Sequence, residues 1–344
     1  MHGKQNIAGR REMKKQWRSA DESVNYKDKK FQNISPTPAL AEGVSYSKVF
    51  KEYFKKPATA NPAAPIPSVA TNLRALKGEE PVIVWFGHSS YLIHYRGKNI
   101  LVDPVFSGHA SPIPGTVKAF AGADIYKPQD MPDIDIMLIT HNHYDHLDKK
   151  TLAALQPRTG AYYTSLGVGK DIVSCTSGNQ QVTEMDWWET QTIAPGITLT
   201  ATPARHFSGR GFVRNESLWS SFVLKLDNYT LYLGGDSGYD THFVTIGEKY
   251  GPFDIALLEC GQYNTAWPYI HMMPEQTAQA AVDLKSRVLM PVHWAKFRLA
   301  LHPWNEPAER VSAAAALLNL PLTTPMIGEP VYVGKQYPGG QWWR

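Results

Sequence analysis

Four side chains that can bind a metal ion fall within six consecutive positions of this chain. The segment at 141–146 reads HNHYDH and directly follows the apolar run at residues 134–140. Its candidate ligands are His141, His143, Asp145 and His146. Imidazole nitrogens and carboxylate oxygens are ligands that zinc accepts at about 2.0–2.2 Å, whereas burying such groups together without a metal would be costly. The segment therefore predicts a metal site, in which a turn aims the four side chains at two neighbouring points.

Three further candidate ligands each follow an apolar, strand-like run. They are His206, Asp236 and His293. Two glycines precede Asp236 and would let the backbone turn sharply beside an ion. A single histidine after a strand is as often structural as functional. Because sheet pairing could bring three strand ends to one rim, the three residues together extend the predicted metal site to seven ligands.

The elements that must position these residues are mostly short strands. Apolar and β-branched runs predict strands over residues 82–86, 91–93, 99–102, 134–140, 197–200, 221–226, 230–233, 254–258 and 288–292. Helical patterns cover residues 149–155 and 274–285. Strands in two groups, each followed by helices, predict an α/β fold in which two sheets pack together with helices outside.

The N-terminal quarter of the chain differs from the rest in composition. Residues 1–35 are polar and rich in lysine and arginine, which predicts a flexible basic arm. Residues 36–80 are predicted to hold an amphipathic helix near 44–54 and a proline-rich connector, ahead of a catalytic domain over 81–344. The helix could lie at a lipid surface, but we expect its apolar face to pack on the main domain.

Composition excludes several classes of protein. With 43% hydrophobic and 19% charged residues, the 344-residue chain can bury a core and does not resemble a disordered protein. It has no apolar run of about 18 residues that would span a membrane. The two cysteines, Cys175 and Cys260, form no disulfide framework and fit a reducing compartment, so we expect a cytoplasmic protein that could contact a membrane peripherally. We find no basic-aromatic module for nucleic acid beyond the arm.

The order of the candidate ligands resembles the metallo-β-lactamase superfamily. This resemblance implies a four-layer αββα sandwich that binds two zinc ions per chain. Longer motifs are similar to the N-acylphosphatidylethanolamine phospholipase D group: WFGHSS at 85–90, LVDPVF at 101–106, THNHYDHLD at 140–148, GDSGY at 235–239 and PVHW at 291–294. The FQN at residues 31–33 also resembles the way those chains begin.

The resemblance implies a role for each ligand. One zinc ion would be held by His141, His143 and His206. The other would be held by Asp145, His146 and His293, with Asp236 bridging the two. Since histidine rather than glutamate stands at position 143, the pattern favours zinc over the di-iron relatives. Asp103 resembles the family's carboxylate that orients a ligand loop, or is a turn former before Pro104. His88 would lie near the rim or be a structural histidine.

The resemblance also implies residues that meet the substrate. His271 matches a pocket histidine that could donate a proton, or it is a surface histidine before a helix. We therefore take Asp145 and His271 as catalytic candidates. Where the phospholipases read roughly GAYEPR after a strand, this chain reads CGQYNTAW at 260–267, so Gln262 and Tyr263 are predicted to shape the substrate pocket. This departure leaves the identity of the substrate open.

The function implied is that of a zinc-dependent phosphodiesterase. Two zinc ions would lower the pKa of a water molecule to about 7, and the hydroxide formed would attack phosphorus or a carbonyl carbon. A phosphatidic acid and an N-acylethanolamine would be released. One alternative is a lactonase or another metallohydrolase with a soluble substrate. A second is a membrane-associated binding protein with a relic metal site, although all seven ligand types are present in order. The sequence does not indicate an oligomeric state.

Overall fold

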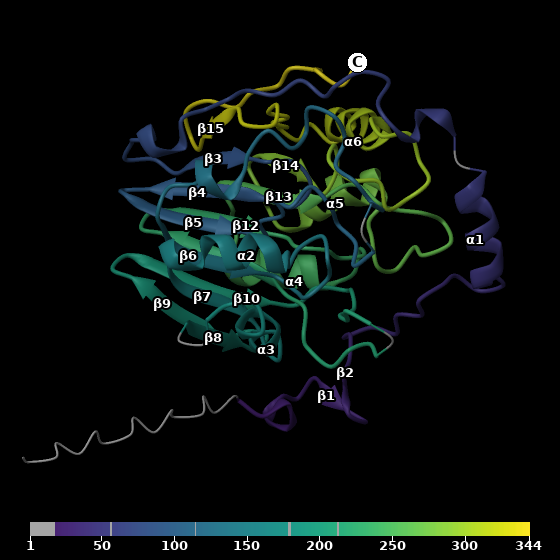
Figure 1. The fold of residues 1–344 in the computed structure, drawn as a ribbon, viewed down its shortest axis with the longest axis horizontal. Helices are drawn as coiled ribbons and strands as arrows, with labels where there is room; N and C mark the ends of the chain where they lie inside the picture. The colour runs from purple at the N-terminus through teal and green to yellow at the C-terminus, as the bar shows by residue number, and fades with distance from the viewer. Residues whose placement is uncertain (1–17, 56, 114, 178–179, 212) are drawn as a thin grey trace, which may run out of the picture.

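Two sheets packed face to face form the centre of the protein (Figure 1). The computed structural model describes residues 18–55, 57–113, 115–177, 180–211 and 213–344. Within these residues one sheet has seven strands, in the order β15 (Pro330–Tyr332), β3 (Val82–Trp85), β4 (Tyr91–Tyr95), β5 (Lys98–Val102), β6 (Ile134–Ile139), β7 (Thr159–Ser165) and β8 (Gln181–Met185). The other has six: β14 (Leu289–Val292), β13 (Ile255–Glu259), β12 (Tyr229–Leu233), β11 (Ser221–Leu226), β10 (Ile197–Thr202) and β9 (Thr190–Ala194).

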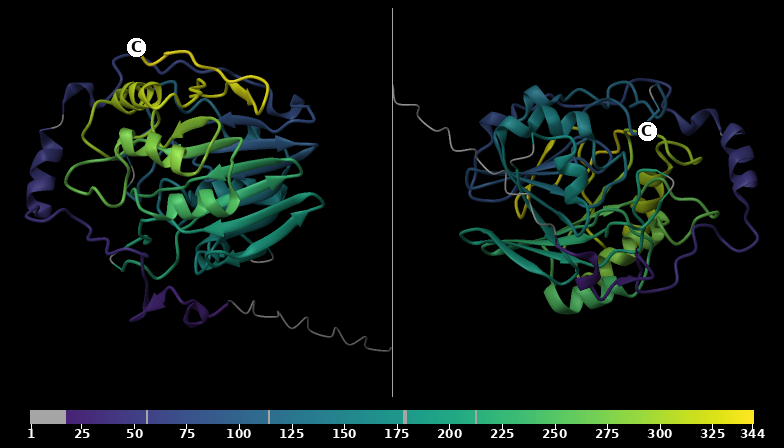
Figure 2. Two further views of the ribbon diagram at one scale, coloured as in Figure 1. Left: turned by 180° about the vertical axis from the view of Figure 1, so that it is seen from behind. Right: turned by 60° about the horizontal axis from the view of Figure 1, so that its bottom comes forward.

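Helices cover the two outer faces of this pair of sheets. The seven-stranded sheet carries α2 (Lys149–Leu155) and α3 (Gly169–Val173). The six-stranded sheet carries α4 (His242–Tyr250), α5 (Pro274–Asp283) and α6 (Glu306–Leu317), which enclose a second core with that sheet. Figure 2 shows these helices from behind. The four layers are those of the predicted αββα sandwich.

Strand direction explains why the candidate ligands can meet. In the seven-stranded sheet, β5 to β8 run parallel, and β3 shares their direction because β4 is antiparallel to both β3 and β5. In the other sheet, β12, β13 and β14 are parallel, and β10 shares their direction through the antiparallel β11. The carboxyl ends of like-directed strands lie at one edge of a sheet, so the turns that follow them are neighbours.

Part of the predicted basic arm belongs to the fold. Residues 1–17 lie outside the described residues, and after them β1 (Tyr26–Lys27) and β2 (Lys30–Phe31) form a short hairpin. The Phe31 side chain is fully buried against Trp219 and its neighbours. Asn33 donates to the carbonyl of His206 at 2.7 Å and accepts from its N–H at 3.0 Å. Residues 31–33 are therefore fixed by packing and hydrogen bonds, not part of a free arm.

The predicted amphipathic helix forms, but its described side chains do not pack as we expected. Helix α1 (Tyr46–Phe54) begins after Ser45, whose hydroxyl accepts from the N–H of Lys48 at 3.3 Å. It lies at the margin of the molecule (Figure 1). Tyr46 is 63% exposed and Phe50 is 65% exposed. Tyr46 and Val49 border a cavity, whereas Phe50 is not among the residues that line it.

A buried lysine links three loops beside the sheet ends. The ammonium of Lys296 donates to the carbonyls of Phe86 at 3.2 Å and Val105 at 2.9 Å, and lies 3.3 Å from a carboxylate oxygen of Asp124. Burial lowers the pKa of Lys296 to about 8, although Asp124 opposes that shift. The ordinary pKa of a lysine is 10.5. Between pH 8 and pH 10.5, Lys296 is therefore mostly neutral in the folded protein and mostly protonated in the unfolded chain.

We therefore expect the contribution of Lys296 to stability to improve as pH rises through this window. The free energy of unfolding of the wild type, minus that of Lys296→Met, should increase by about 2 kcal/mol between pH 7.5 and 9.5. Urea unfolding of the two proteins at both pH values measures this difference. A difference that does not change with pH would contradict the lowered pKa of Lys296.

Candidate metal centre

Three histidine nitrogens converge beside the end of β6. The Nδ1 atom of His143 lies 2.9 Å from Nε2 of His141 and 3.2 Å from Nε2 of His206. Nitrogens that share a tetrahedral zinc ion at 2.0–2.1 Å are about 3.3 Å apart. The structure therefore brings together the first predicted set of ligands, although His206 comes from the turn after β10 in the opposite sheet.

Hydrogen bonds on the far side of each ring aim the metal-binding nitrogens. The Nδ1 atom of His141 faces the hydroxyl of Thr140 at 3.0 Å, and that hydroxyl donates to Asp103. Nδ1 of His206 faces the carbonyl of Ile270 at 2.9 Å. These acceptors favour a proton on Nδ1 and leave the Nε2 lone pair free. Burial lowers the pKa of both His141 and His206 well below the usual value, so both rings are neutral.

Asp236 lies between the two groups of histidines. Its Oδ2 atom is 3.2 Å from Nε2 of His146 and 3.7 Å from Nε2 of His206, and its Oδ1 atom is 3.1 Å from Nδ1 of His293. Burial would raise the pKa of Asp236, but His146 and His293 hold it well below the usual value. Gly235, at φ +59°, lets the chain turn here, since a Cβ atom would lie 3.0 Å from the carbonyl of Ser220.

The second group combines the remaining predicted ligands with His88. Ligand atoms of His88, Asp145, His146 and His293 lie within 4.8 Å of one another. His88 Nε2 is 2.8 Å from Oδ2 of Asp145, so it orients the carboxylate that we predicted to bind metal. Its backbone exchanges hydrogen bonds with the turn after β14: His88 N–H donates to Trp294, and His293 N–H donates to His88, both at 2.9 Å. His88 thus lies inside the ligand cluster.

The buried polar atoms of this cluster fit a cation. Among the described residues, Nε2 of His293 is buried and has no hydrogen-bond partner, and Nε2 of His146 and Oδ1 of Asp236 have no partner beyond the ion-pair contacts within the cluster. Such atoms cost free energy when they are left unpaired. Neutral imidazoles and ionised carboxylates are the donors that zinc and related metals accept.

Asp103 connects the ligand loop to β5 through hydrogen bonds. It follows β5 and is almost fully buried. One carboxylate oxygen accepts from the N–H of Thr140 at 2.8 Å, and the other accepts from the Thr140 hydroxyl at 2.7 Å and faces His146 Nδ1 at 2.8 Å. Both ends of the loop therefore depend on one carboxylate, which also leaves Nε2 of His146 pointing toward Asp236.

The comparisons with known proteins agree with this geometry. A family model described as "Beta-lactamase superfamily domain" matches residues 98–294. An uncharacterized protein of Mycobacterium tuberculosis is 36% identical over 340 residues, covering 94% of this chain and 88% of the relative. The N-acyl-phosphatidylethanolamine-hydrolyzing phospholipase D 1 of Caenorhabditis elegans is 30% identical over 268 residues, covering 71% and 74%.

This chain belongs to the metallo-β-lactamase superfamily. The solved structure of Igni18, a metallo hydrolase from Ignicoccus hospitalis, shares the fold with a TM-score of 0.57 and 22% identity, over 73% of this chain and 97% of that one. The protein is therefore a metal-dependent hydrolase of this fold, with relatives among the N-acylphosphatidylethanolamine phospholipases.

His271 faces the same cavity, next to a glutamate that we did not predict. Ligand atoms of Asp236, His271 and His293 lie within 4.8 Å of one another. Glu259, the last residue of β13, is fully buried, and its Oε2 atom lies 3.5 Å from Nδ1 of His271. Burial by itself would lower the pKa of His271, but the neighbouring Glu259 raises it above the usual value. Burial also raises the pKa of Glu259, to about 7. In the sequence, the only sign of this residue's role was its position, as a glutamate at the end of an apolar strand.

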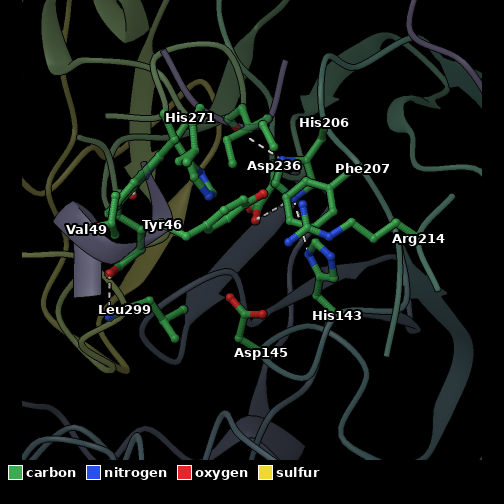
Figure 3. A pocket seen from close by; sticks show the side chains of 15 residues that line it. Tyr46, Val49, His143, Asp145, His206, Phe207, Arg214, Asp236, His271 and Leu299 are labelled. Carbon is green, nitrogen blue, oxygen red and sulfur yellow. Dashed lines mark hydrogen bonds and ion pairs between the residues drawn. The ribbon is translucent and has the colours of Figure 1, made fainter. Parts of the chain in front are cut away.

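The cavity above the cluster has an apolar side and a cationic side (Figure 3). Its volume is about 260 Å³. Figure 3 shows Tyr46, Val49 and Leu299 on one side and Arg214 on the other, with Asp145, His143 and His271 between. The cavity therefore offers an apolar wall directly beside the candidate metal ligands.

The two residues predicted to shape the pocket lie in different places. Gln262 borders the cavity, but its amide is used by the loop that carries His293, because Oε1 accepts from the N–H groups of Leu299 at 2.8 Å and Ala300 at 2.9 Å. Tyr263 is not among the lining residues. Its hydroxyl donates to Glu306 at 2.7 Å. The structure thus does not bring Tyr263 to the cavity.

Proposed function

We propose that this protein is a zinc-dependent phosphodiesterase of the N-acylphosphatidylethanolamine phospholipase D type. The observation that carries the proposal is the clustering of seven candidate metal ligands, four of which border, together with His271, one cavity with an apolar wall. The names of two relatives support it: the Caenorhabditis elegans protein and a mitochondrial N-acyl-phosphatidylethanolamine-hydrolyzing phospholipase D of Saccharomyces cerevisiae, which is 33% identical over 243 residues.

Two zinc ions would be held as the sequence resemblance implies. His141, His143 and His206 would hold one ion. Asp145, His146 and His293 would hold the other, with Asp236 between them. When bound, the ions would supply Lewis acidity toward a phosphoryl oxygen and lower the pKa of water.

Side chains of the protein would orient the metal ligands and provide a proton to the leaving group. His88 holds Asp145 in place through its 2.8 Å contact. His271 would protonate the leaving oxygen, because its ring borders the cavity and lies beside the Glu259 carboxylate, which raises the pKa of His271. The apolar wall would exclude water and contact the acyl chains of a lipid.

We expect His271→Gln to lose turnover without losing metal. General acids contribute about 10²–10⁴-fold to rate, so kcat should fall by about a hundredfold or more while the metal content of the variant stays that of the wild type. His94→Gln is the matched control, since His94 lies on β4 and pairs with Asn99. Equal kcat values for the His271 variant and the wild type would remove His271 from the mechanism.

Helix α1 supports a proposed peripheral contact with lipid. Its exposed Tyr46 and Phe50 lie among the exposed Lys48, Lys51 and Lys55, a combination that suits the surface of an anionic bilayer. No helix in the part of the chain that the structure describes is both long and apolar enough to cross a membrane. Through α1, a lipid surface would be next to the cavity mouth.

Turnover of defined substrates tests the proposed function. The zinc-loaded protein should release phosphatidic acid from N-acylated phosphatidylethanolamine, and plain phosphatidylethanolamine shows whether the N-acyl group is required. The alternative, a metallohydrolase with a soluble substrate, predicts hydrolysis of a lactone or a soluble phosphodiester instead. No turnover of either lipid, together with turnover of a soluble substrate, would reject the lipid assignment.

A further inference from the structure

The cavity over the candidate metal ligands continues into a groove that is not lined by α1. This groove has a volume of about 480 Å³ and shares His143, Asp145, Phe207, Arg214 and Leu299 with the cavity. Arg214 also borders a third hollow beside His206 and Asn33. One guanidinium group is therefore at the junction of three hollows next to the ligand cluster.

Aromatic contacts place this guanidinium beside the candidate ligands. The Arg214 guanidinium carbon is 4.8 Å from the centroid of the Phe207 ring. That ring is in turn 4.5 Å from the ring of His143 and 4.8 Å from the ring of His206. Figure 3 shows Arg214 extending toward His143, across the cavity from Tyr46 and Leu299. The cation is therefore oriented by Phe207 toward the space where a substrate would contact the metals.

The neighbouring arginines are occupied by protein groups. Arg210 donates to the carbonyls of Asn142 at 2.9 Å and Leu147 at 2.7 Å, so it stabilises the ligand loop. Arg205 donates to the carbonyl of Pro36 at 2.7 Å and lies 3.7 Å from a carboxylate oxygen of Asp240. In the described ranges, by contrast, Arg214 has neither a carboxylate partner nor a backbone acceptor. Its N–H groups remain available to a ligand.

We propose that Arg214 is a specificity-determining residue that binds an anionic phosphoryl oxygen of the substrate. This inference rests on the proposed function, and it adds a reason why the site would select phosphodiesters over neutral esters. A guanidinium forms charge-assisted hydrogen bonds with phosphate oxygens. A neutral ester has no such charge, so Arg214 contributes nothing to its binding.

The test compares an anionic and a neutral substrate in the zinc-loaded protein. For Arg214→Gln we expect kcat/KM toward bis(4-nitrophenyl) phosphate to fall by about tenfold, mainly through a higher KM. Turnover of 4-nitrophenyl acetate should stay within about twofold of wild type. Arg214→Lys should recover part of the loss, because it keeps the charge but loses the planar donor geometry. Arg96→Gln, at an exposed arginine that pairs with Glu79 and Asp227, is the matched control.

Binding of inorganic phosphate gives a readout that does not depend on activity. Calorimetry should show phosphate bound about tenfold more weakly by zinc-loaded Arg214→Gln than by wild type or Arg96→Gln, with a smaller dependence on salt. Equal losses on both substrates, or unchanged phosphate affinity, would overturn the role of Arg214. A wild-type protein that hydrolyses only neutral esters would reject the phosphodiesterase, while the phosphate measurement would still decide whether Arg214 binds anions.

Discussion

Replacing Asp236 by asparagine is expected to reduce hydrolysis by more than about a thousandfold, since a metal ion contributes several kcal/mol to the transition state. Asp236 is the carboxylate that lies between both groups of histidines, with its Oδ2 atom 3.2 Å from Nε2 of His146 in one group and 3.7 Å from Nε2 of His206 in the other. Asparagine removes the negative charge and offers a single acceptor oxygen. We therefore expect the variant to bind less than the full complement of zinc.

Metal analysis and turnover measured on the same sample test this expectation. Asp135→Asn is the control, because Asp135 pairs with Lys98 at a partly exposed position remote from the ligands. A binding protein with a relic metal site would keep its affinity for lipid when Asp236 is changed and would show no turnover to lose. Retention of two zinc ions per chain with near wild-type turnover would instead remove Asp236 from the site.

The second large effect is expected at Asp103. Asp103→Asn should weaken zinc binding by about 10–100-fold, as changes to residues that orient metal ligands do. It should also lower the free energy of unfolding by about 3 kcal/mol, since it breaks a buried charged pair. The physical reason is that Asp103 accepts from Thr140 through both oxygens and faces His146 at 2.8 Å. An asparagine amide must direct its NH₂ group at one of these donors.

Chelator competition measures the zinc affinity of this variant, and urea unfolding measures its stability. Thr140→Val provides a graded comparison, because it keeps the carboxylate and removes the hydroxyl that donates to Asp103 at 2.7 Å and faces Nδ1 of His141 at 3.0 Å. We expect that change to cost about 1 kcal/mol. Similar zinc affinities for Asp103→Asn and the wild type would show that the ligand loop keeps its shape without the carboxylate.

Local sequence patterns predicted many of the elements. Helix α2 and strand β11 have the predicted bounds, because apolar spacing is a local signal. Strands β7, β8 and β9 were not predicted; β9 reads TQTIA, is mostly polar and has no buried position. Helix α6 was also not predicted, although Pro307 in its first turn and its run of alanines are typical helix signals.

The sequence by itself determined the types and order of the candidate metal ligands, because each follows an apolar strand and can be found by its position after that strand. For Asp103 it left two roles open, that of a carboxylate that orients the ligand loop and that of a turn former. Only the tertiary structure decided that Glu259 faces His271, that His88 holds Asp145, that Tyr263 points to Glu306 and that Arg214 borders the cavity. Those contacts join residues from separate strands and turns, and their distances depend on the order of strands in two sheets. Local periodicity carries no information about that order.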